Sequence, residues 1–473
     1  MRKIKQKPVL EKILIEDYAA EGKSLARVDG KVIFVEGAVP GDVVDIQLQK
    51  NKADWAEGFA KHFHSYSAIR VQPFCKHFGV CGGCQWQMLP YEQQLKYKHQ
   101  QVVDNLTRIS KVALPEIPAI LGADQTEGYR NKVEYTFATE KFIPFEEFKA
   151  MKAAGTDVLP SKGAGGFHAR GFFEKVVEID TCFLQIEPTN LMRKAVVNFA
   201  MDNDMPLYNI KQHQGWLRNM FVRNTTAGQW MVNIILGYED KPKREALLNL
   251  LLKQFPQITT LLYTINTKRN DSMQDLEPQV FFGKGFITEK LEDFEFKISP
   301  KSFFQTNSKQ AEKLYQVTRA FASLTGKEVV YDLYCGTGSI GIFCSKQAKK
   351  IIGVEFVADA IEDAKQNATM NQLTDTAFFA GDVIDICTDA FFETHGKPDV
   401  IITDPPRAGM HEKLIRKLLE MEAPLIVYVS CNPATQARDL ALLDEKYIVT
   451  KIQPVDMFPH TLHIENVVQL TRR

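Results

Sequence analysis

The last third of the chain alternates short apolar runs with amphipathic stretches. The apolar runs are EVVYDLYCG, IIGVEF, DVIITDPP and LIVYVSCNP, and the amphipathic stretches include DAIEDAKQNATMNQ, MHEKLIRKLLEME and ATQARDLALLD. This rhythm predicts strand–helix–strand units and a parallel sheet. The final stretch, KYIVTKIQPVDMFPHTLHIENVVQLTRR, lacks a long helical pattern and predicts strands that close the sheet. We therefore expect an α/β domain over residues 296–473.

The first two thirds have a different pattern. Residues 1–66 read as short strands separated by Gly, Asp and Pro, which predicts a small β-barrel. A segment rich in Cys, Gly and Gln follows, and then the helical pattern YEQQLKYKHQQVVDNLTRISK. Further strand-like runs predict a central α+β domain over residues 67–295. Within it, residues 141–166 look like a flexible insertion.

Composition sets broad limits on the class of protein. A chain of 473 residues that is 45% hydrophobic and 25% charged is typical of a globular protein of several domains. Neither a signal peptide nor a membrane-spanning apolar run is apparent, and eight cysteines are too few for a disulfide scaffold. We expect a cytoplasmic protein. The 58 basic and 58 acidic residues give no net charge, which neither supports nor excludes a nucleic-acid partner.

A glycine-rich turn follows the first strand of the α/β domain. In VVYDLYCGTGSIGIF, Asp332 ends the strand and Gly336, Gly338 and Gly341 open the next helix. Such glycines allow a tight turn and a close approach of a ligand, and Glu355 after the next strand is placed to bind ribose hydroxyls. The pattern predicts a Rossmann-like domain. It fits NAD, S-adenosylmethionine or a merely structural turn, although the acidic residue favours a cofactor without a pyrophosphate.

Three further strand ends carry candidate site residues. Asp404 lies in the rigid Asp-Pro-Pro-Arg sequence, and Cys431 follows a strongly apolar strand. Ligands of open α/β sheets bind at the carboxyl ends of strands, where both residues are expected. Asp382, in FFAGDV, could accept a hydrogen bond from an adenine amine. The alternatives are an ordinary Gly-Asp turn for Asp382 and a buried core thiol for Cys431.

The cysteine and a late carboxylate suggest a specific chemistry. Carbon 5 of uracil is too weak a nucleophile to accept a methyl group directly, but addition of a thiolate to carbon 6 activates it. Cys431 is our candidate for this nucleophile. A base must then remove the proton on carbon 5, and Glu465, among apolar neighbours at the start of the last strand, is our candidate. The alternative for Glu465 is a solvated carboxylate at a strand end.

A series of motifs resembles the RNA 5-methyluridine methyltransferase family. The motifs, in the order of that family, are KSFFQTN, DLYCGTGSIGIF, IIGVE, DPPRAG, SCNPATQARDL and HIENVVQL. The resemblance implies methylation of carbon 5 of a uridine in RNA, with Cys431 as nucleophile and Glu465 as base. It also implies contacts to S-adenosylmethionine from Gln305, Tyr334, Glu355 and Asp404, beside Gly336 of the glycine turn. Phe303 resembles an aromatic residue that packs on the target base, whereas read alone it is more often core.

Four cysteines form a separate candidate site. Cys75, Cys81 and Cys84 have the spacing C-x5-C-x2-C, and Cys182 is isolated. Four thiolates can hold zinc or a 4Fe-4S cluster, and the three-plus-one arrangement without a histidine pair favours the cluster over zinc or free thiols. The resemblance agrees, because the ribosomal-RNA members of the family carry such a cluster. It implies 23S ribosomal RNA as the partner of this chain.

The remaining motifs concern RNA binding. The first 65 residues resemble a TRAM domain, an RNA-binding β-barrel, and YRNKVEYTF, FHARGFFEKVVEID and WLRNMFVR resemble family motifs of the central domain. Arg130, Lys132, Arg218 and Arg223 are expected to be available for phosphates. We expect a monomer that binds RNA and no membrane. The alternatives are the same chemistry on transfer RNA, an NAD-linked iron–sulfur oxidoreductase and a non-catalytic RNA-binding protein.

Overall fold

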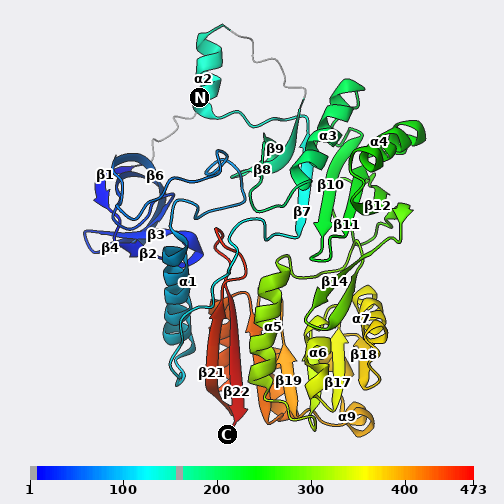
Figure 1. Ribbon diagram of the computed structural model, residues 1–473. Helices are drawn as coiled ribbons and strands as arrows, with labels where there is room; N and C mark the ends of the chain where they lie inside the picture. Colours follow the sequence, from blue (N-terminus) through cyan, green and yellow to red (C-terminus); the bar gives the residue numbers. More distant parts are fainter. Residues whose placement is uncertain (1–7, 156–162) are drawn as a thin grey trace.

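The N-terminal part is a six-stranded mixed sheet in the order β1-β5-β6-β4-β3-β2. The computed structural model describes residues 8–155 and 163–473. In it, this sheet lies beside helix α1 (Tyr91–Asn105) (Figure 1). Alternate side chains point inward and form a small apolar core, as the barrel prediction requires. The elements are β1 (Val9–Leu14), β2 (Asp17–Tyr18), the 3-10 helix η1 (Ala20–Gly22), β3 (Ser24–Val28), β4 (Lys31–Glu36), β5 (Val43–Asn51) and β6 (Trp55–Ser65).

The central part is a seven-stranded sheet in the order β13-β12-β11-β10-β7-β8-β9. Two helices pack their apolar faces on this sheet. Its strands are β7 (Lys132–Ala138), β8 (Ala164–Ala169), β9 (Phe172–Glu178), β10 (Leu217–Asn224), β11 (Trp230–Leu236), β12 (Ile258–Ile265) and β13 (Gln279–Gly283), and the helices are α3 (Thr189–Asp202) and α4 (Lys241–Gln254). Of the insertion-like segment 141–166, α2 (Phe145–Ala153) buries none of its side chains, and residues 156–162 lie outside the described part.

The C-terminal part is a seven-stranded sheet in the order β18-β17-β16-β19-β20-β22-β21, which confirms the α/β prediction. The first five strands in this order are parallel, and β22 runs antiparallel to β20 and β21. The strands are β16 (Val329–Leu333), β17 (Lys350–Glu355), β18 (Thr376–Ala380), β19 (Val400–Thr403), β20 (Leu425–Ser430), β21 (Tyr447–Val455) and β22 (Glu465–Arg472). The helices are α5 (Ser308–Ala322), α6 (Ser339–Cys344), η3 (Ser345–Gln347), α7 (Ala358–Met370), α8 (Val383–Ile386), α9 (Asp389–His395), α10 (Glu412–Met421) and α11 (Pro433–Leu443).

Two segments assigned by sequence to the central domain pack in the C-terminal core instead. The hairpin of β14 (Ile287–Leu291) and β15 (Phe294–Ile298) buries its apolar side chains on one face of the C-terminal sheet. On the other face, α1 (Tyr91–Asn105) and the π-helical turn η2 (Leu106–Ser110) contribute Val102 and Leu106. The boundary expected between residues 295 and 296 therefore falls inside β15. Periodicity identifies an apolar face, but it does not say which core receives that face.

None of the helices in residues 8–155 and 163–473 combines the length and the apolar character needed to cross a membrane. In Figure 1, α1 runs alongside β21, and the central sheet lies above the carboxyl ends of the parallel strands. That edge of the C-terminal sheet therefore faces the other two parts of the molecule.

Candidate active site

Strand pairing brings the predicted nucleophile and base together. Ser430 on β20 pairs with Asn466 on β22, and these strands are antiparallel. The next position in the register is therefore Cys431 opposite Glu465. On the neighbouring strands, Leu333 pairs with Thr403, so the chain leaves β16 and β19 at the same edge. The sheet thus assembles one site from strand ends that are far apart in the sequence.

The thiol of Cys431 is half-buried among charged groups. Burial raises its pKa to about 11, with further upward contributions from the carboxylates of Glu465 and Asp404 and a downward one from Arg407. These electrostatic contributions require all three groups to lie close to the sulfur. Near neutral pH the thiol of the free protein is protonated. Its addition to a substrate therefore requires loss of that proton as the nucleophile engages.

Asp404, which is half-buried, and Glu465, which is buried, form an acidic pair. Burial is the main cause that raises the pKa of both carboxyl groups, and the charge of Asp404 adds to the rise at Glu465. Glu465 is 5% exposed. Two carboxylates at such close range do not both ionise easily, so the pair retains a proton to a higher pH than an isolated carboxyl group. A group of this kind is suited to proton transfer near neutral pH.

The glycine turn is built from residues in the left-handed region. Tyr334 has φ +61°, and Gly336 and Gly338 have φ +53° and +76°. The backbone N–H of Gly336 donates to Oε2 of Glu355 at 3.2 Å, while Oε1 accepts the N–H of Val357 at 2.9 Å. Tyr334 adopts its conformation at a steric cost that glycine does not have. The turn brings Tyr334 near Glu355, and contact of both with a cofactor stays a prediction.

Asp332 lies beneath this turn and is fully buried. Its Oδ2 accepts the N–H of Gly341 at 2.8 Å, but its Oδ1 has no hydrogen-bond partner among the described residues. Burial raises its pKa to about 7, and the charges of Asp404 and Glu355 add to the rise. A buried acceptor without a donor at the cofactor turn fits a ligand that carries donors or positive charge.

The remaining residues predicted to contact the cofactor or the target base differ in their exposure to solvent. Gln305 is buried, and its backbone oxygen accepts a hydrogen bond from Nδ2 of Asn131 at 3.1 Å. Phe303 nearby is 69% exposed, so it is not a core residue. Asp382 is exposed and its Oδ1 caps α8 by accepting the N–H of Ile384 at 2.8 Å. Capping accounts for Asp382 without any ligand, so its contact with adenine stays a prediction.

The four cysteines of the second candidate site come from segments that dock on each other. The N–H of Gly82 donates to the carbonyl of His168 at 3.1 Å, and the N–H of Asp180 donates to Nε2 of His77 at 3.0 Å. Burial raises the pKa of Cys84 to about 12 and that of Cys182 to about 11, and neighbouring thiols add to both rises. The cysteines are therefore neighbours. Among the described residues, however, no group of three or more His, Cys, Asp or Glu side chains has a metal-coordinating arrangement.

Two of the four cations expected to contact phosphate are structural. Arg218 is 1% exposed and donates to the carbonyls of Asn266 and Lys268 at 2.7 Å. Arg223 is also buried and donates to the carbonyl of Ser302 at 3.1 Å. The prediction for both was wrong, because the guanidinium groups satisfy backbone acceptors inside the protein. The other two are half-buried: Nε of Arg130 donates to the carbonyl of Lys132, and burial together with Arg223 lowers the pKa of Lys132 to about 8.

Sequence reasoning did not single out Tyr315 of α5. Its hydroxyl lies 2.9 Å from Oγ of Ser339 at the start of α6. Burial raises its pKa, and the charges of Asp404, Asp332 and Glu465 add to the rise, so the ring lies next to the acidic groups of the site. Its position in an amphipathic helix gave no signal that distinguishes it from a core tyrosine.

Comparisons with known proteins identify related families, sequences and a related structure. Residues 274–473 match the family model described as tRNA (Uracil-5-)-methyltransferase, and residues 11–60 match the TRAM domain. The chain is 51% identical over 459 residues to an uncharacterized RNA methyltransferase of Bacteroides thetaiotaomicron, covering 96% of this chain and 100% of the relative. It is 48% identical to one of Porphyromonas gingivalis, covering 97% and 99%. A crystal structure of the Pyrococcus abyssi tRNA (uracil-54, C5)-methyltransferase in complex with S-adenosyl-L-homocysteine matches with a TM-score of 0.73 and 27% identity, covering 97% and 99%.

Proposed function

Because the chain belongs to the RNA methyltransferase family of the uracil-5 type, we propose that it methylates carbon 5 of a uridine through a covalent adduct on Cys431. The observation that carries the proposal is the pairing of β20 with β22, which sets Cys431 opposite Glu465 beside Asp404. A nucleophile, a proton acceptor and a cofactor turn then share one edge of the sheet.

Cys431 opens the reaction in this proposal. Its thiol releases its proton to water, the sulfur forms a bond to carbon 6 of the uracil, and the electron pair of the 5,6 double bond moves toward the carbonyl oxygen at carbon 4. Arg407, which lowers the pKa of the thiol, favours the thiolate needed for this attack. Phe303, exposed on the segment before α5, is suited to stack on the target base.

Glu465 completes the reaction. After carbon 5 has accepted the methyl group, its proton must leave before the carbon–sulfur bond can break. Glu465 takes that proton, the electrons restore the double bond, and Cys431 leaves as a thiolate. Burial and Asp404 raise the pKa of Glu465, which makes the carboxylate a stronger base than a solvated one.

The cofactor turn fits S-adenosylmethionine. Glu355 would bind the ribose, Tyr334 would pack on the adenine, and Asp332 would offer its unpartnered Oδ1 to the cationic end of the molecule. Gln305 and Asp404 would complete the cradle, and Asp382 would contact the adenine amine. The bound cofactor supplies the electrophilic methyl group.

For the substrate and the cysteines, we propose 23S ribosomal RNA and a 4Fe-4S cluster. The donor set is four cysteines without a carboxylate, and Cys75, Cys81 and Cys182 lie near enough to Cys84 to contribute to the raised pKa of its thiol. Cys75, Cys81, Cys84 and Cys182 would hold the cluster, which would fix the fold of this segment. Protein purified without oxygen should contain about four irons per chain. Stoichiometric zinc without iron would refute the cluster.

Transfer RNA is the second candidate for the substrate, because the matching family model and crystal structure both carry it in their names.

The mechanism is tested with labelled ribosomal and transfer RNA on a denaturing gel. Cys431→Ala should lose both methylation and the RNA–protein adduct. Glu465→Gln should transfer the methyl group but retain the RNA on Cys431, so a shifted band should accumulate. Cys387→Ala and Glu445→Gln serve as controls, because Cys387 is a buried core thiol of the same domain and Glu445 is exposed. Activity in Cys431→Ala, or wild-type turnover without an adduct in Glu465→Gln, would overturn the assignment. Mapping 5-methyluridine in cells without the protein identifies the RNA.

A further inference from the structure

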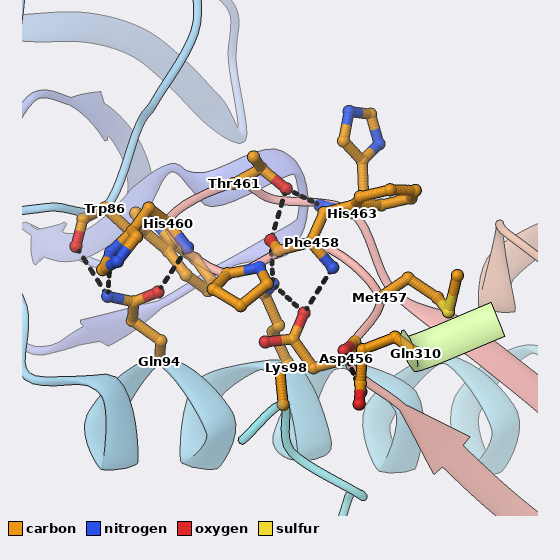
Figure 2. Close-up of polar contacts among 12 residues, drawn as sticks. Trp86, Gln94, Lys98, Gln310, Asp456, Met457, Phe458, His460, Thr461 and His463 are labelled. Atoms are coloured by element: carbon orange, nitrogen blue, oxygen red, sulfur yellow. Dashed lines mark hydrogen bonds and ion pairs between the residues drawn. The ribbon is translucent and has the colours of Figure 1, made fainter. Parts of the chain in front are cut away.

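The loop before Glu465 is held by a buried polar network. Residues 456–464 connect β21 to β22, and we call them the base loop. Figure 2 shows this loop lying over α1, with the side chains of Gln94 and Lys98 pointing from the helix into it. These two residues are four positions apart and therefore share one face of α1. Both are fully buried.

Lys98 and Asp456 form an ion pair without solvent. Nζ of Lys98 lies 2.6 Å from Oδ1 of Asp456, and both side chains are 0% exposed. Nζ also donates to the carbonyl of Phe458 at 3.1 Å. The second carboxylate oxygen of Asp456 accepts the hydroxyl of Tyr91 at 2.8 Å, and the first accepts the N–H of Phe458 at 3.1 Å. The pair therefore clamps the beginning of the base loop onto α1.

Gln94 fixes the middle of the base loop. Its Oε1 accepts the backbone N–H of His460 at 2.9 Å, and its Nε2 lies 3.1 Å from Nδ1 of the same residue. His460 has φ +65°, a conformation that a residue with a side chain adopts at a steric cost. The carbonyl of His460 accepts the N–H groups of Gln85 and Trp86. The amide of Gln94 thus holds a strained residue between α1 and the cysteine-containing segment.

The base loop is also tied from the side of α5. Nε2 of Gln310 donates to the carbonyl of Asp456 at 2.7 Å, and Nδ2 of Asn307 donates to that of Met457 at 2.9 Å. The hydroxyl of Tyr129 donates to the carbonyl of Pro459 at 2.9 Å. These bonds fix the loop on the sides that face α5 and the central domain. Glu465 is the first residue after the loop, so its position depends on them.

A buried ion pair is an inefficient way to stabilise a fold. Removing both charges from water costs free energy that their attraction offsets only in good geometry, and a well-packed apolar pair often stabilises a protein as well. What the charges supply is a fixed position. Here the fixed element leads directly to the proton acceptor of the reaction.

We propose that Lys98 and Gln94 are positioning residues, which hold the base loop so that Glu465 faces the proton on carbon 5. This inference rests on the proposed function. It assigns to α1 a role in the elimination step, which otherwise involves only residues of the C-terminal sheet.

The test uses the full chain and the Lys98→Met/Asp456→Asn double variant, which removes both charges and keeps the shape of the pair. Turnover should fall by about tenfold to a hundredfold with little change in KM for RNA, since small misplacement of a reacting group costs that much. The RNA–Cys431 adduct should accumulate, as in Glu465→Gln, while the melting temperature changes little. Gln94→Met, which leaves the ion pair intact, should trap the same adduct and decides the question if the double variant does not fold.

The matched control removes an ion pair between a half-buried and a buried side chain in another part of the molecule. Arg70 and Asp42 form a 2.6 Å pair in the N-terminal barrel, with Asp42 fully buried. Arg70→Met/Asp42→Asn should change the melting temperature without trapping an adduct. Folded Lys98 and Gln94 variants that turn over at the wild-type rate, or lose activity without an adduct, would overturn the positioning role. If wild-type protein forms neither 5-methyluridine nor a Cys431-dependent adduct on any RNA, the proposed function itself fails.

Discussion

Replacing Asp332 by asparagine should stabilise the protein above neutral pH. The carboxyl group is fully buried, and one of its oxygens has no partner among the described residues. Its pKa rises from an ordinary 3.8 to about 7, mainly through burial. Because the folded pKa exceeds the unfolded one, the folded state binds the proton more tightly. The contribution of Asp332 to stability is thus fully present at low pH and is lost as the pH rises through about 7.

The magnitude follows from the difference between the folded and unfolded pKa. A folded-state pKa that lies about three above the unfolded one lowers the unfolding free energy by about 4 kcal/mol at pH 8. Less than half of this loss has occurred at pH 5. The side chain introduced by Asp332→Asn carries no charge and can keep an acceptor for the N–H of Gly341, so the variant should avoid most of this loss. Relaxation of the site makes about 4 kcal/mol an upper value. The difference between variant and wild type should be small at pH 4 and should grow up to about pH 8.

The assay is the unfolding free energy from urea titrations between pH 4 and pH 8. Asp439 is the matched control, because it is also fully buried but its Oδ2 accepts the N–H of Met410 and the hydroxyl of Tyr428. Asp439→Asn should destabilise the protein at every pH, since it disturbs donors that are now paired. Asp332→Asn should also weaken binding of S-adenosylmethionine. A constant stability difference across this pH range would refute the reasoning.

Two further predictions concern charges. Arg407→Ala should slow alkylation of Cys431 by iodoacetamide at pH 8, and Asp404→Asn should speed it, because Arg407 lowers and Asp404 raises the pKa of the thiol. Mass spectrometry of the Cys431 peptide measures both alkylation rates. Rates equal to that of the wild type would contradict the electrostatic account. Arg218→Ala should destabilise the protein by about 3 kcal/mol, because it leaves buried carbonyls without donors. The folded fraction should bind RNA with unchanged affinity. A selective loss of RNA affinity would show that Arg218 contacts phosphate.

The sequence was sufficient to predict the C-terminal sheet, because each strand is a short apolar run followed by a helical period. The end of each strand then placed Asp404 and Cys431 at one edge. Their placement needed only the rule that parallel strands share a direction. Glu465 was harder, since it lies at the beginning of an antiparallel strand, and its position alone left a solvated carboxylate as an alternative until the motif resemblance supported the role of base. The register of β20 and β22 supplies the physical reason for its position.

Burial of polar residues could not be predicted in the same way. An arginine in a strand-like run, such as Arg223, looks like a surface cation, and only the fold reveals the carbonyls that it binds. Lys98 and Gln94 look like the polar face of a surface helix for the same reason. Their partners, Asp456 and His460, lie 358 and 366 positions later in the chain. Sequence periodicity describes one element at a time and contains no information about such a partner.

The domain boundary that the sequence predicts at residue 296 cuts through the buried core of the C-terminal part. A fragment of residues 296–473 starts inside β15 and lacks the buried side chains of Ile287, Leu291 and Phe294, together with Val102 and Leu106 on the opposite face. At about 2 kcal/mol for each buried apolar side chain, the loss is about 10 kcal/mol, which is as large as the stability of a typical domain. We expect the fragment to show no cooperative unfolding and no calorimetric binding of S-adenosylmethionine. Residues 284–473 mixed with a peptide of residues 88–122 should recover part of the binding that the full chain shows, because the peptide restores α1. Full affinity in the 296–473 fragment alone would mean that the helix and hairpin cover the core without supporting it.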